Sequence, residues 1–596
     1  MSTLKKIITL LTTAERKRLI ALLGMILVMA FLDVIGVASI LPFMAVLANP
    51  ELVETNIILS TIYHKLNFTN ADQFLFFLGS MVFLLLIFSL AFKAFTTYAQ
   101  LRFAFMREYS LGRRLVKGYL SQPYTWFLNR HSIDLGKNVL SEVGLFVGNG
   151  LIPLLTLVAQ SAIVIAMLIL LLIVDPFLAL TVGSVLGIAY GLMIKLSSKF
   201  LLDAGEERLK YNRQRFMIVG EAFGAVKEIK VNSLEGVYTR RFEEPAAAFA
   251  KHSASAQIVA QLPRFALEAI SFGGMLLILL YLIGNDQKFT EALPIITLYA
   301  FAGYRLMPAL NLIYSSFAKL RFSSPALNAL HTDLTSLSQS DLYNEHSEEK
   351  IILKKELHLN NIFFNYPKTK KPALKEINLT IPVYSTIGLI GSTGSGKTTV
   401  MDLMLGILKP QQGVFMVDGQ IINNSNYRQW QKIIGYVPQQ IYLADDSIAA
   451  NIAFGVEPCN INQAAVERAS KIASLHEFVV NELPEGYTTT VGERGVRLSG
   501  GQRQRIGIAR ALYHNPSVLF LDEATSALDN LTERAVMDAV NSLKHKITII
   551  IIAHRLSTVR QCDCIYVLNK GKIEAQGTYD ELMQKHDEFK VMVQSK

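Results

Sequence analysis

The stretch GLIGSTGSGKTTV, Gly388 to Val400, predicts a phosphate-binding loop and with it the fold of the chain's second half. A β-prone run leads into the glycines and a helical pattern follows them, which is the strand–loop–helix context that such a loop requires. Glycines let backbone N–H groups converge on phosphate oxygens, and the helix N-terminus favours negative charge. We expect Lys397 to reach the β- and γ-phosphates of ATP and the Thr398 hydroxyl to ligate Mg²⁺. The expected ATP-binding residues of this loop are Gly391, Ser392, Thr393, Gly394, Ser395, Gly396, Lys397, Thr398 and Thr399.

A second pattern, VLFLDE at Val518 to Glu523, predicts a buried strand that ends in two carboxylates. Asp522 at the strand end can hold Mg²⁺, directly or through water, and Glu523 can orient or deprotonate the attacking water. A strand-terminal Asp-Glu pair carries little information alone. Because this pair follows a phosphate loop at a plausible separation, it predicts an ATP-hydrolysing site.

The first half of the chain has the composition of a membrane protein. Of the 596 residues 51% are hydrophobic and 18% are charged, and the apolar excess lies between Arg18 and Lys319. The net charge of +10 could indicate nucleic-acid binding, but cytoplasmic Lys and Arg of a membrane protein give the same sign. Since no basic helix or aromatic-basic platform stands out, we expect no nucleic-acid partner. The three cysteines lie in the second half, and we interpret them as reduced cytosolic thiols.

Six apolar runs each approach or exceed the roughly 20 residues that cross a hydrocarbon core. They cover residues 19–48, 74–95, 151–174, 176–196, 265–284 and 293–313, and Asp175-Pro176 separates the third from the fourth. Lys and Arg before the first run and in the long segments after the second and fourth runs place these parts on the cytoplasmic side. The sequence therefore predicts a multi-pass protein with both termini and its soluble domain in the cytoplasm.

Each long cytoplasmic segment contains an elbow, at Ser121–Phe127 and Val226–Asn232. These elbows are either contact points for the soluble domain or simple solvated turns. The polar stretch His331–Lys350 lacks an apolar stripe and reads as a linker. We expect a membrane domain at 1–325 with two coupling elbows, a linker at 326–352 and a soluble domain at 353–596.

The motif LSGGQRQR, Leu498 to Arg505, resembles the signature of the ATP-binding cassette family, and the resemblance extends over nearly the whole chain. It implies that Gln439 lies near Mg²⁺ and acts in catalysis, that His554 is the switch histidine, and that Tyr366 stacks on adenine. It also assigns Asp529 to the D-loop. The signature residues that it implies for ATP binding are Ser499, Gly500, Gly501 and Gln502.

In this family the signature serves the γ-phosphate of the opposite subunit, so the resemblance implies a homodimer with two ATP molecules between its cassettes. Six membrane spans followed by a cassette look like an exporter half-transporter. The fold class expected is thus a polytopic α-helical membrane domain fused to an α/β P-loop domain. A purely soluble cassette protein is the alternative from another class, and the six spans argue against it.

Four stretches are similar to PglK-type flippases of lipid-linked oligosaccharides. Two lie in the membrane half, Leu262–Phe272 and Tyr304–Asn311, and two in the cassette, Gly435–Gly455 and Ile552–Asp563. This resemblance implies ATP-driven flipping of a polyprenyl-pyrophosphate-type glycolipid for protein glycosylation, in a bacterial inner membrane. The alternative is a general lipid, lipopolysaccharide-precursor or multidrug exporter. At 56–68, Ile58, Ile62 and Leu66 have helical spacing and could form an amphipathic helix at the membrane surface or an ordinary loop helix.

Three cations inside or beside apolar runs are candidate substrate residues, because a buried charge is costly unless it faces a cavity or reaches water. At 1.5 Å per residue, Lys93 and Arg264 lie about 28 Å from the outer ends of their spans and Arg305 about 20 Å. Such cations suit an anionic headgroup such as a pyrophosphate. The rival interpretations are snorkelling of the side chains, or pairing of Arg264 with Glu268 one helical turn on.

Overall fold

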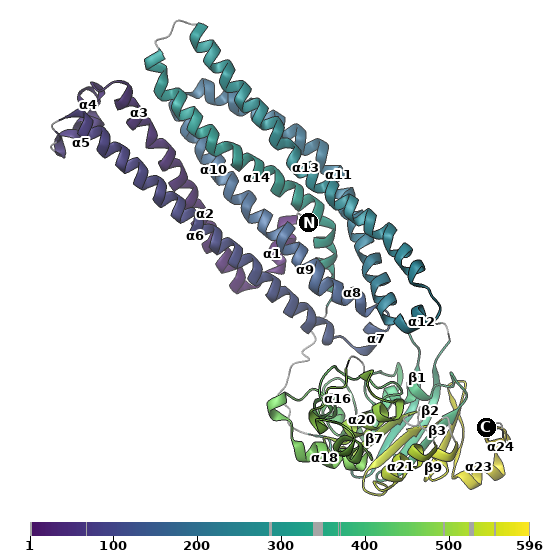
Figure 1. The fold of residues 1–596 in the computed structure, drawn as a ribbon. Helices are drawn as coiled ribbons and strands as arrows, with labels where there is room; N and C mark the ends of the chain where they lie inside the picture. Colours follow the sequence, from purple (N-terminus) through teal and green to yellow (C-terminus); the bar gives the residue numbers. More distant parts are fainter. Residues whose placement is uncertain are drawn as a thin grey trace. The chain divides into compact units, whose positions relative to one another are not determined.

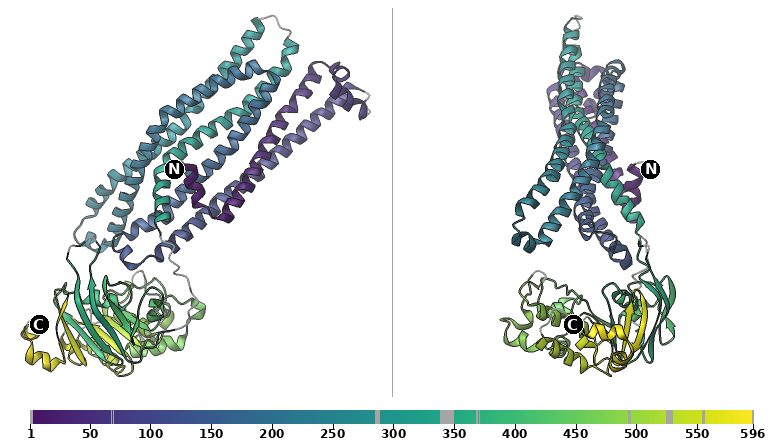
Figure 2. Two further views of the ribbon diagram at one scale, coloured as in Figure 1. Left: turned by 180° about the vertical axis from the view of Figure 1, so that it is seen from behind. Right: turned by 90° about the vertical axis from the view of Figure 1, so that its right-hand side faces the viewer.

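The computed structural model of the chain contains two compact units, each with its own core (Figures 1 and 2). Unit 1 comprises Met1–Gln122 and Arg130–Ser340, and unit 2 comprises Pro123–Asn129 and Asp341–Lys596. The structure describes residues 3–66, 68, 70–284, 289–337, 350–367, 369, 371–492, 495–523, 530–553 and 556–594.

Unit 1 is helical throughout its described elements, and its long helices run side by side (Figure 1). Four of them have 48 to 50 residues, or about 75 Å at 1.5 Å per residue, so each is more than twice as long as a hydrocarbon core is thick. The elements are α1 (Thr3–Leu10), α2 (Thr13–Ala38), α3 (Ile40–Ala48), α4 (Leu52–Thr55), α5 (Ile57–Lys65), α6 (Ala71–Leu120), α8 (Ser132–Lys137), η1 (Asn138–Glu142), α9 (Val143–Phe146), η2 (Val147–Leu151), α10 (Ile152–Val174), α11 (Pro176–Gly224), α12 (Val226–Val231), α13 (Glu235–Gly284) and α14 (Phe289–Ser336).

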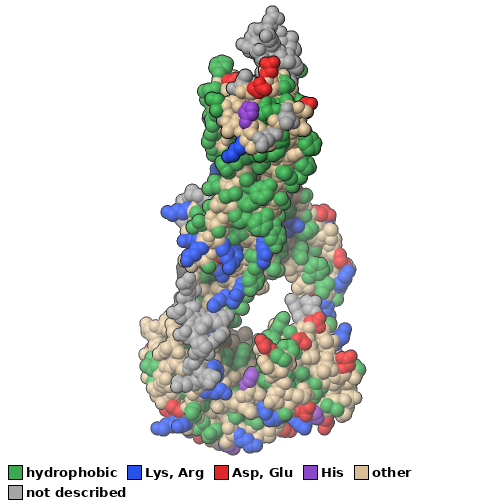
Figure 3. Space-filling model, turned by 90° about the vertical axis from the view of Figure 1, so that its left-hand side faces the viewer, with side chains coloured by type: hydrophobic (Ala, Val, Ile, Leu, Met, Phe, Trp, Pro, Cys, Tyr) green, Lys and Arg blue, Asp and Glu red, His purple; other side chains and the backbone are tan. Residues whose placement is uncertain are grey.

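Four helical stretches among the described residues are long and apolar enough to cross a membrane: Thr13–Ala48, Ala71–Leu120, Ser132–Val174 and Ala179–Gly224. These four contain the first three predicted spans and residues 179–196 of the fourth, which was predicted at 176–196. The fifth and sixth predicted spans lie on α13 and α14, where many side chains between 267 and 296 are outside the described residues. Those two spans stay predictions. Figure 3 shows apolar side chains covering much of this unit's visible face, with Lys and Arg gathered toward one end.

The break between the third and fourth predicted spans falls where the sequence placed it. Helix α10 ends at Val174 and α11 begins at Pro176, a residue that fits the first turn of a helix because it needs no N–H acceptor there. The backbone N–H of Asp175 donates to the carbonyl of Leu171 and closes the end of α10.

Helices α11, α13 and α14 approach closely because small residues line their contact. Ala204, Ala256 and Ala318 are buried together with Tyr314 in one cluster. A Cβ atom at Gly205 would collide with the backbone carbonyl of Phe322 on α14, so only glycine permits this distance between α11 and α14.

Helix α14 continues beyond the predicted end of the membrane domain at residue 325 and ends at Ser336. Ala326, Leu327 and Leu330 are each 3% exposed, at spacings that place them on one helix face. The first part of the predicted linker at 326–352 is therefore packed helix, because these three apolar residues extend the core of unit 1. Residues 338–349 lie outside the described residues.

Helix α5 occupies the loop in which an amphipathic helix was predicted. Ile62 and Leu66 are exposed, whereas Leu59 is buried with Phe74 and Leu78. The side chain of Ile58 lies outside the described residues. Part of the helix therefore packs on α6 while two apolar side chains face outward, and its position at a membrane surface stays a prediction.

Unit 2 holds two sheets (Figure 2). The antiparallel sheet has the order β2-β1-β4-β5, with β1 at Glu356–Phe364, β2 at Leu374–Pro382, β4 at Gln412–Val417 and β5 at Gln420–Ile421. The second sheet has the order β10-β9-β3-β8-β7-β6, with β3 at Thr386–Gly391, β6 at Ile434–Val437, β7 at Val518–Asp522, β8 at Thr548–Ile552, β9 at Cys564–Asn569 and β10 at Lys572–Gly577. All its neighbouring pairs are parallel except β9 and β10.

Strands β7 and β8 are buried at every position, which is the pattern of parallel strands covered on both faces. The helices that accompany the sheets are α15 (Lys397–Met404), α16 (Tyr427–Gln431), α17 (Ile448–Ile452), α18 (Gln463–Ile472), α19 (His476–Asn481), α20 (Gly500–Leu512), α21 (Asn530–Asn541), α22 (Leu556–Val559), α23 (Tyr579–Lys585) and α24 (Asp587–Gln594), with short turns η3 (Pro458–Asn460) and η4 (Gly486–Thr488). Since β3, β8, β7 and β6 are parallel, their carboxyl ends meet at one edge of the sheet.

Candidate nucleotide site and a buried ion cluster

The predicted phosphate loop leaves the end of β3 and enters α15, in the predicted strand–loop–helix order. Its glycines have conformations that few other residues adopt: φ is +80° at Gly394 and +106° at Gly396. A Cβ atom at Gly396 would lie 2.8 Å from Cδ2 of Leu374. The loop geometry therefore depends on glycine at these positions.

The ammonium group of Lys397 closes the loop upon itself. Its Nζ donates to the backbone carbonyls of Gly391 and Ser392, at 3.0 Å each. The loop borders a cavity of about 820 Å³, large enough for a nucleotide. The cavity is lined by Tyr366, Ala373, Thr393, Gly394, Gly396, Lys397, Thr398, Thr399, Gln439, Leu521, Glu523, Met537, Ile551, Ile552, Ala553 and Thr558.

The carboxylate pair and Gln439 meet at the same sheet edge, from the ends of β7 and β6. Asp522 is the last residue of β7 and is 5% exposed. Glu523 follows with a φ of +49°, and its Oε2 accepts a hydrogen bond of 2.7 Å from Nε2 of Gln439. The structure thus brings together three groups that lie up to 84 positions apart in the chain.

Burial and neighbouring charge raise the pKa of two carboxyls at this edge. The pKa of Asp522 is raised to about 6 by burial and by the charge of Glu523, against the opposing effect of Lys397. The pKa of Asp402 on α15 is also raised to about 6, by burial and by the charge of Asp522. Negative charge is thus concentrated beside Lys397, an arrangement that a divalent cation would stabilise.

The oxygen donors here suit Mg²⁺, which prefers carboxylate and hydroxyl oxygens and often relies on one protein carboxylate plus phosphate oxygens. Asp522, Thr398 and Gln439 offer such oxygens. Among the described residues no cluster of three or more His, Cys, Asp or Glu side chains could hold a metal without added ligands. The donor set fits a magnesium ion that a nucleotide's phosphates help to bind.

Tyr366 lines the cavity, and its contact with a base stays a prediction. Its hydroxyl is 3.2 Å from Oγ1 of Thr399, and its ring packs edge-on against Phe364 at 5.1 Å between centroids. Since the ring is only partly buried, one side of it can contact a ligand.

The signature residues occupy a different part of unit 2. Ser499 caps the start of α20: its Oγ accepts from the backbone N–H of Gln502, and its own N–H donates to Oε1 of Gln502 at 2.7 Å. Ser499 is exposed, and none of the described signature residues lines the cavity. The two remaining predicted residues, Asp529 and His554, lie outside the described residues.

The first elbow, predicted at Ser121–Phe127, belongs to unit 2 from Pro123 onward. It forms α7 (Tyr124–Phe127) within the segment Pro123–Asn129, whose contacts group it with the cassette half of the chain. The second elbow forms α12, which is grouped with unit 1. Ile229 of α12 is buried, and the exposed Val231 is the last residue of this helix.

In unit 1 two of the three candidate substrate cations meet on a residue that the sequence analysis missed. Asp33 on α2 is 1% exposed, with Lys93 Nζ 3.4 Å from its Oδ2 and Arg305 Nη1 3.6 Å from its Oδ1. The Ser89 hydroxyl donates to Oδ1 at 2.8 Å. Asp33 stands inside the first predicted span, so the cost of an unpaired carboxylate in an apolar run could have identified it.

The third cation does not join this cluster. Nε of Arg264 on α13 donates to Oε1 of Glu268 at 2.7 Å, so the rival interpretation, a pair one helical turn apart, is confirmed. Arg264 thus differs from the other two candidate substrate cations: it is 65% exposed and its charge is offset by a carboxylate on its own helix.

Comparisons with known proteins cover both halves of the chain. A sequence model of the family described as "ABC transporter" matches residues 374–526. The "ATP-dependent lipid A-core flippase" of Cupriavidus pinatubonensis is 33% identical over 437 residues, which cover 72% of each protein. Its namesake in Cupriavidus metallidurans is 32% identical over 475 residues, 78% of each.

A longer relative matches only in part. The "ABC transporter B family member 14" of Arabidopsis thaliana is 42% identical over 238 residues, which are 40% of this chain and 19% of that protein. Among solved structures, "Structure of a bacterial Atm1-family ABC exporter with ATP bound" has a TM-score of 0.77 and covers 97% of this chain and 98% of that one. At 22% identity this likeness shows the fold alone.

Proposed function

This chain belongs to the ATP-binding cassette exporters, which couple ATP hydrolysis to transport, and on this basis we propose that it flips a lipid-linked oligosaccharide of the polyprenyl-pyrophosphate type outward across a membrane. Export of lipids or glycolipids in general accords with two relatives that are named lipid A-core flippases. The pyrophosphate-linked glycan is the finer part of the proposal.

The observation that carries the proposal is the ion cluster of Asp33, Lys93 and Arg305. Its two cations and one carboxylate leave one net positive charge within helices whose other side chains are mostly apolar. Lys93 is 34% exposed and Arg305 is 17% exposed, whereas Asp33 is 1% exposed. A headgroup with phosphate oxygens could thus reach the cations without reaching the carboxylate. A guanidinium and an ammonium are the groups that bind phosphate best.

At the nucleotide site we assign ATP and Mg²⁺ to the cavity beside the phosphate loop. Lys397 would leave the loop carbonyls for the β- and γ-phosphates, while Thr398, Asp522 and Gln439 supply oxygens to the metal. Glu523 would orient and deprotonate the attacking water, held in place by its hydrogen bond from Gln439. Tyr366 would contact the base.

Because the signature does not line the cavity of its own chain, we propose that the working unit is a homodimer. The signature of each chain, Ser499 to Gln502, would close the cavity of the other, with Asp529 and His554 completing each site. The proposed location is a bacterial inner membrane, with six spans and with the termini and cassette in the cytoplasm. We propose elbows α7 and α12 as the coupling segments.

The second candidate function is export of other lipids, a lipopolysaccharide precursor or drugs by the same architecture. Exposed apolar side chains on α6 and α11, among them Phe83, Phe88, Ile188 and Leu192, favour no particular amphiphile. A glycan-modifying enzyme is a third class, and no catalytic carboxylate pair or nucleophile is apparent among the described residues of unit 1.

The test is flipping of a polyprenyl-pyrophosphate-linked sugar in proteoliposomes, with ATP hydrolysis followed in the same samples. Lys93→Ala and Arg305→Ala should each slow flipping about ten- to hundredfold, since a charge-assisted hydrogen bond is worth roughly 1.5–3 kcal/mol. Arg305→Lys should restore flipping in part, because the charge remains but the planar fork does not. Basal ATP hydrolysis should persist.

Arg264→Ala is the matched control, because it removes a cation of unit 1 whose guanidinium is paired with Glu268. It should reduce flipping much less than Arg305→Ala. Normal flipping by Lys93→Ala and Arg305→Ala would remove the cluster from the substrate path. A wild-type protein that moves only uncharged amphiphiles would favour the second candidate function.

A further inference from the structure

We propose that Asp33 is an internal counter-anion of the headgroup site, a positioning residue that acts through Lys93 and Arg305 and keeps binding of an anionic headgroup reversible. The inference deepens the proposed function and rests on it. Between transport cycles Asp33 pairs with both cations. During transport an anionic headgroup binds the cations in its place, and Asp33 then competes with the headgroup and helps to release it.

Three helices contribute the residues of the cluster around the Asp33 carboxylate. Asp33 lies on α2, Ser89 and Lys93 lie four residues apart on α6, and Arg305 lies on α14. Residues four apart share a helix face, so α6 offers its hydroxyl and its ammonium group to the same carboxylate. The Ser89 hydroxyl holds Oδ1 at 2.8 Å and fixes the orientation of the carboxylate independently of the two cations.

The contacts to the cations are looser than this hydrogen bond. They measure 3.4 Å for Lys93 and 3.6 Å for Arg305, whereas strong charge-assisted N–H···O bonds measure about 2.7–2.9 Å. For comparison, the Arg264–Glu268 pair measures 2.7 Å. Among the described residues Asp33 is the only ionic or hydrogen-bonding partner of both cationic head groups, so most of their donors remain for a ligand.

Burial explains why such an anion is needed. Two cations side by side in an apolar bundle repel each other and lose hydration, so that without a counter-ion they would bind any phosphate group tightly and release it slowly. With Asp33 the net charge of the cluster is +1, and without it the charge would be +2. An intermediate charge allows both capture and release, which a transporter needs on opposite sides of the membrane.

The variants for the test are chosen by the net charge that each leaves on the cluster. Asp33→Asn keeps the shape and an oxygen acceptor for Ser89 and changes the net charge of the cluster to +2. Lys93→Gln changes it to zero, and the double variant Asp33→Asn/Lys93→Gln restores +1. Asp72→Asn is the matched control, because Asp72 is an exposed carboxylate in the first turn of α6, the helix that carries Ser89 and Lys93.

The experiment measures binding and flipping of a fluorescent polyprenyl pyrophosphate by the full-length protein, with ATP hydrolysis in the same samples. Asp33→Asn should bind the probe about tenfold more tightly, with a steeper dependence on salt, and should flip it about tenfold more slowly at saturation. KM and kcat therefore fall together. Affinity for the probe should be highest in Asp33→Asn, equal in the wild type and the double variant, and lowest in Lys93→Gln.

A purely structural Asp33 would give a different order. Its loss would weaken binding, and the double variant would be worse than either single variant, with lower thermal stability; this outcome overturns the inference. Unchanged affinity and rate in Asp33→Asn also overturn it. If the wild type binds no pyrophosphate lipid, the proposed function and the inference both fail. If the wild type binds and flips the lipid but the variants do not follow the expected affinity order, only the inference fails.

Discussion

The carboxylate of Glu523, which follows β7, accepts a hydrogen bond of 2.7 Å from Nε2 of Gln439. We predict that Glu523→Gln abolishes multiple turnover of ATP, by about 10²- to 10⁴-fold, because the group that activates water is lost. ATP binding should stay within about twofold of wild type, since the phosphate loop is unchanged. Steady-state hydrolysis and equilibrium nucleotide binding measure the two effects.

Lys397→Ala is the contrasting variant for this prediction. It removes the charge expected at the β- and γ-phosphates and should weaken nucleotide binding itself. Wild-type turnover in Glu523→Gln would remove Glu523 from its proposed role. Equal loss of nucleotide binding in both variants would mean that Glu523 holds the nucleotide rather than the water.

At the scale of residues, local motifs were predictable and long-range pairs were not. The phosphate loop could be placed because its geometry depends on glycines next to one another, with positive φ at Gly394 and Gly396. The hydrogen bond between Gln439 and Glu523 joins residues 84 positions apart, and only the family resemblance brought them to one site. Asp33 was missed because its partners stand 60 and 272 positions away on other helices.

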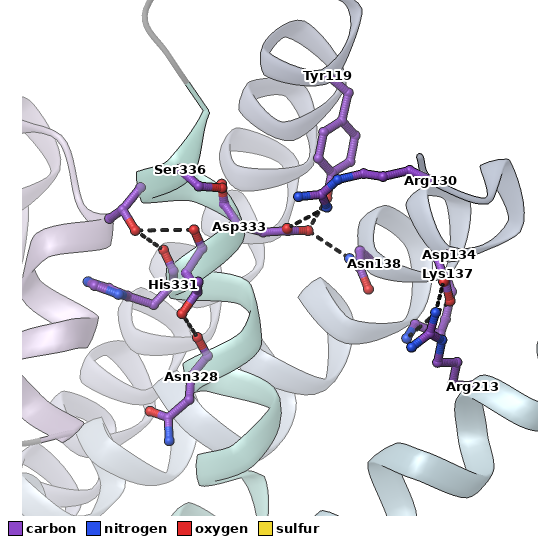
Figure 4. A network of polar contacts seen from close by, with 12 residues as sticks. Tyr119, Arg130, Asp134, Lys137, Asn138, Arg213, Asn328, His331, Asp333 and Ser336 are labelled. Atoms are coloured by element: carbon purple, nitrogen blue, oxygen red, sulfur yellow. Dashed lines mark hydrogen bonds and ion pairs between the residues drawn. The ribbon is translucent and has the colours of Figure 1, made fainter. Parts of the chain in front are cut away.

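At the scale of elements, the end of α14 is joined to two neighbouring elements through one carboxylate (Figure 4). Asp333 accepts hydrogen bonds from the hydroxyl of Tyr119 at 2.7 Å, from Arg130 at 3.0 Å and from Nδ2 of Asn138 at 2.8 Å. The donors come from the end of α6, from the residue after the segment Pro123–Asn129, and from η1. Asp333 therefore joins α14 to the end of α6, to Arg130 and to η1 within unit 1.

We predict that Asp333→Ala lowers the stability of unit 1 by about 2–4 kcal/mol, because three donors to a charged acceptor lose it together. The measurement is thermal unfolding of the full-length protein in detergent. Asp333→Asn is the matched control: it keeps an acceptor oxygen and should lose less, chiefly the ionic contact with Arg130. Equal melting temperatures for Asp333→Ala and wild type would contradict a structural role for these contacts.

Element types were easier to predict than their boundaries. Apolar length alone predicted the first four runs, which lie in helices long and apolar enough to cross a membrane, and the Asp175-Pro176 break was recognisable because proline begins helices. The end of the membrane domain was placed too early, since Ala326, Leu327 and Leu330 form a short apolar face inside an otherwise polar stretch. Packing, rather than composition, decides where α14 stops.

At the scale of the whole molecule, the proposed homodimer requires that each chain carry two separate parts of a nucleotide site. The cavity at the phosphate loop and the signature at the start of α20 lie apart within unit 2. In the proposed homodimer the two parts act together across the two chains, in a head-to-tail arrangement that a twofold axis makes reciprocal.

The last prediction tests this assembly. Ser499→Arg should block ATP hydrolysis by the homodimer, because a large cation replaces the hydroxyl that faces the other chain's phosphate. The cassette should stay folded, since loss of a serine N-cap costs only about 0.5–2 kcal/mol. In a 1:1 mixture of Ser499→Arg and Glu523→Gln subunits, the heterodimer combines the intact phosphate-loop half of the first with the intact signature of the second.

That heterodimer has one working site and one site with both defects. Random pairing makes about half of the dimers mixed, so the mixture should recover up to about a quarter of the wild-type sites, although each variant alone is inactive. Steady-state hydrolysis after subunit exchange measures the recovery, and thermal unfolding checks that Ser499→Arg is folded. Because the recovery needs two chains, hydrolysis at the wild-type rate by a demonstrably monomeric preparation would overturn the composite site, and so would wild-type hydrolysis by Ser499→Arg alone.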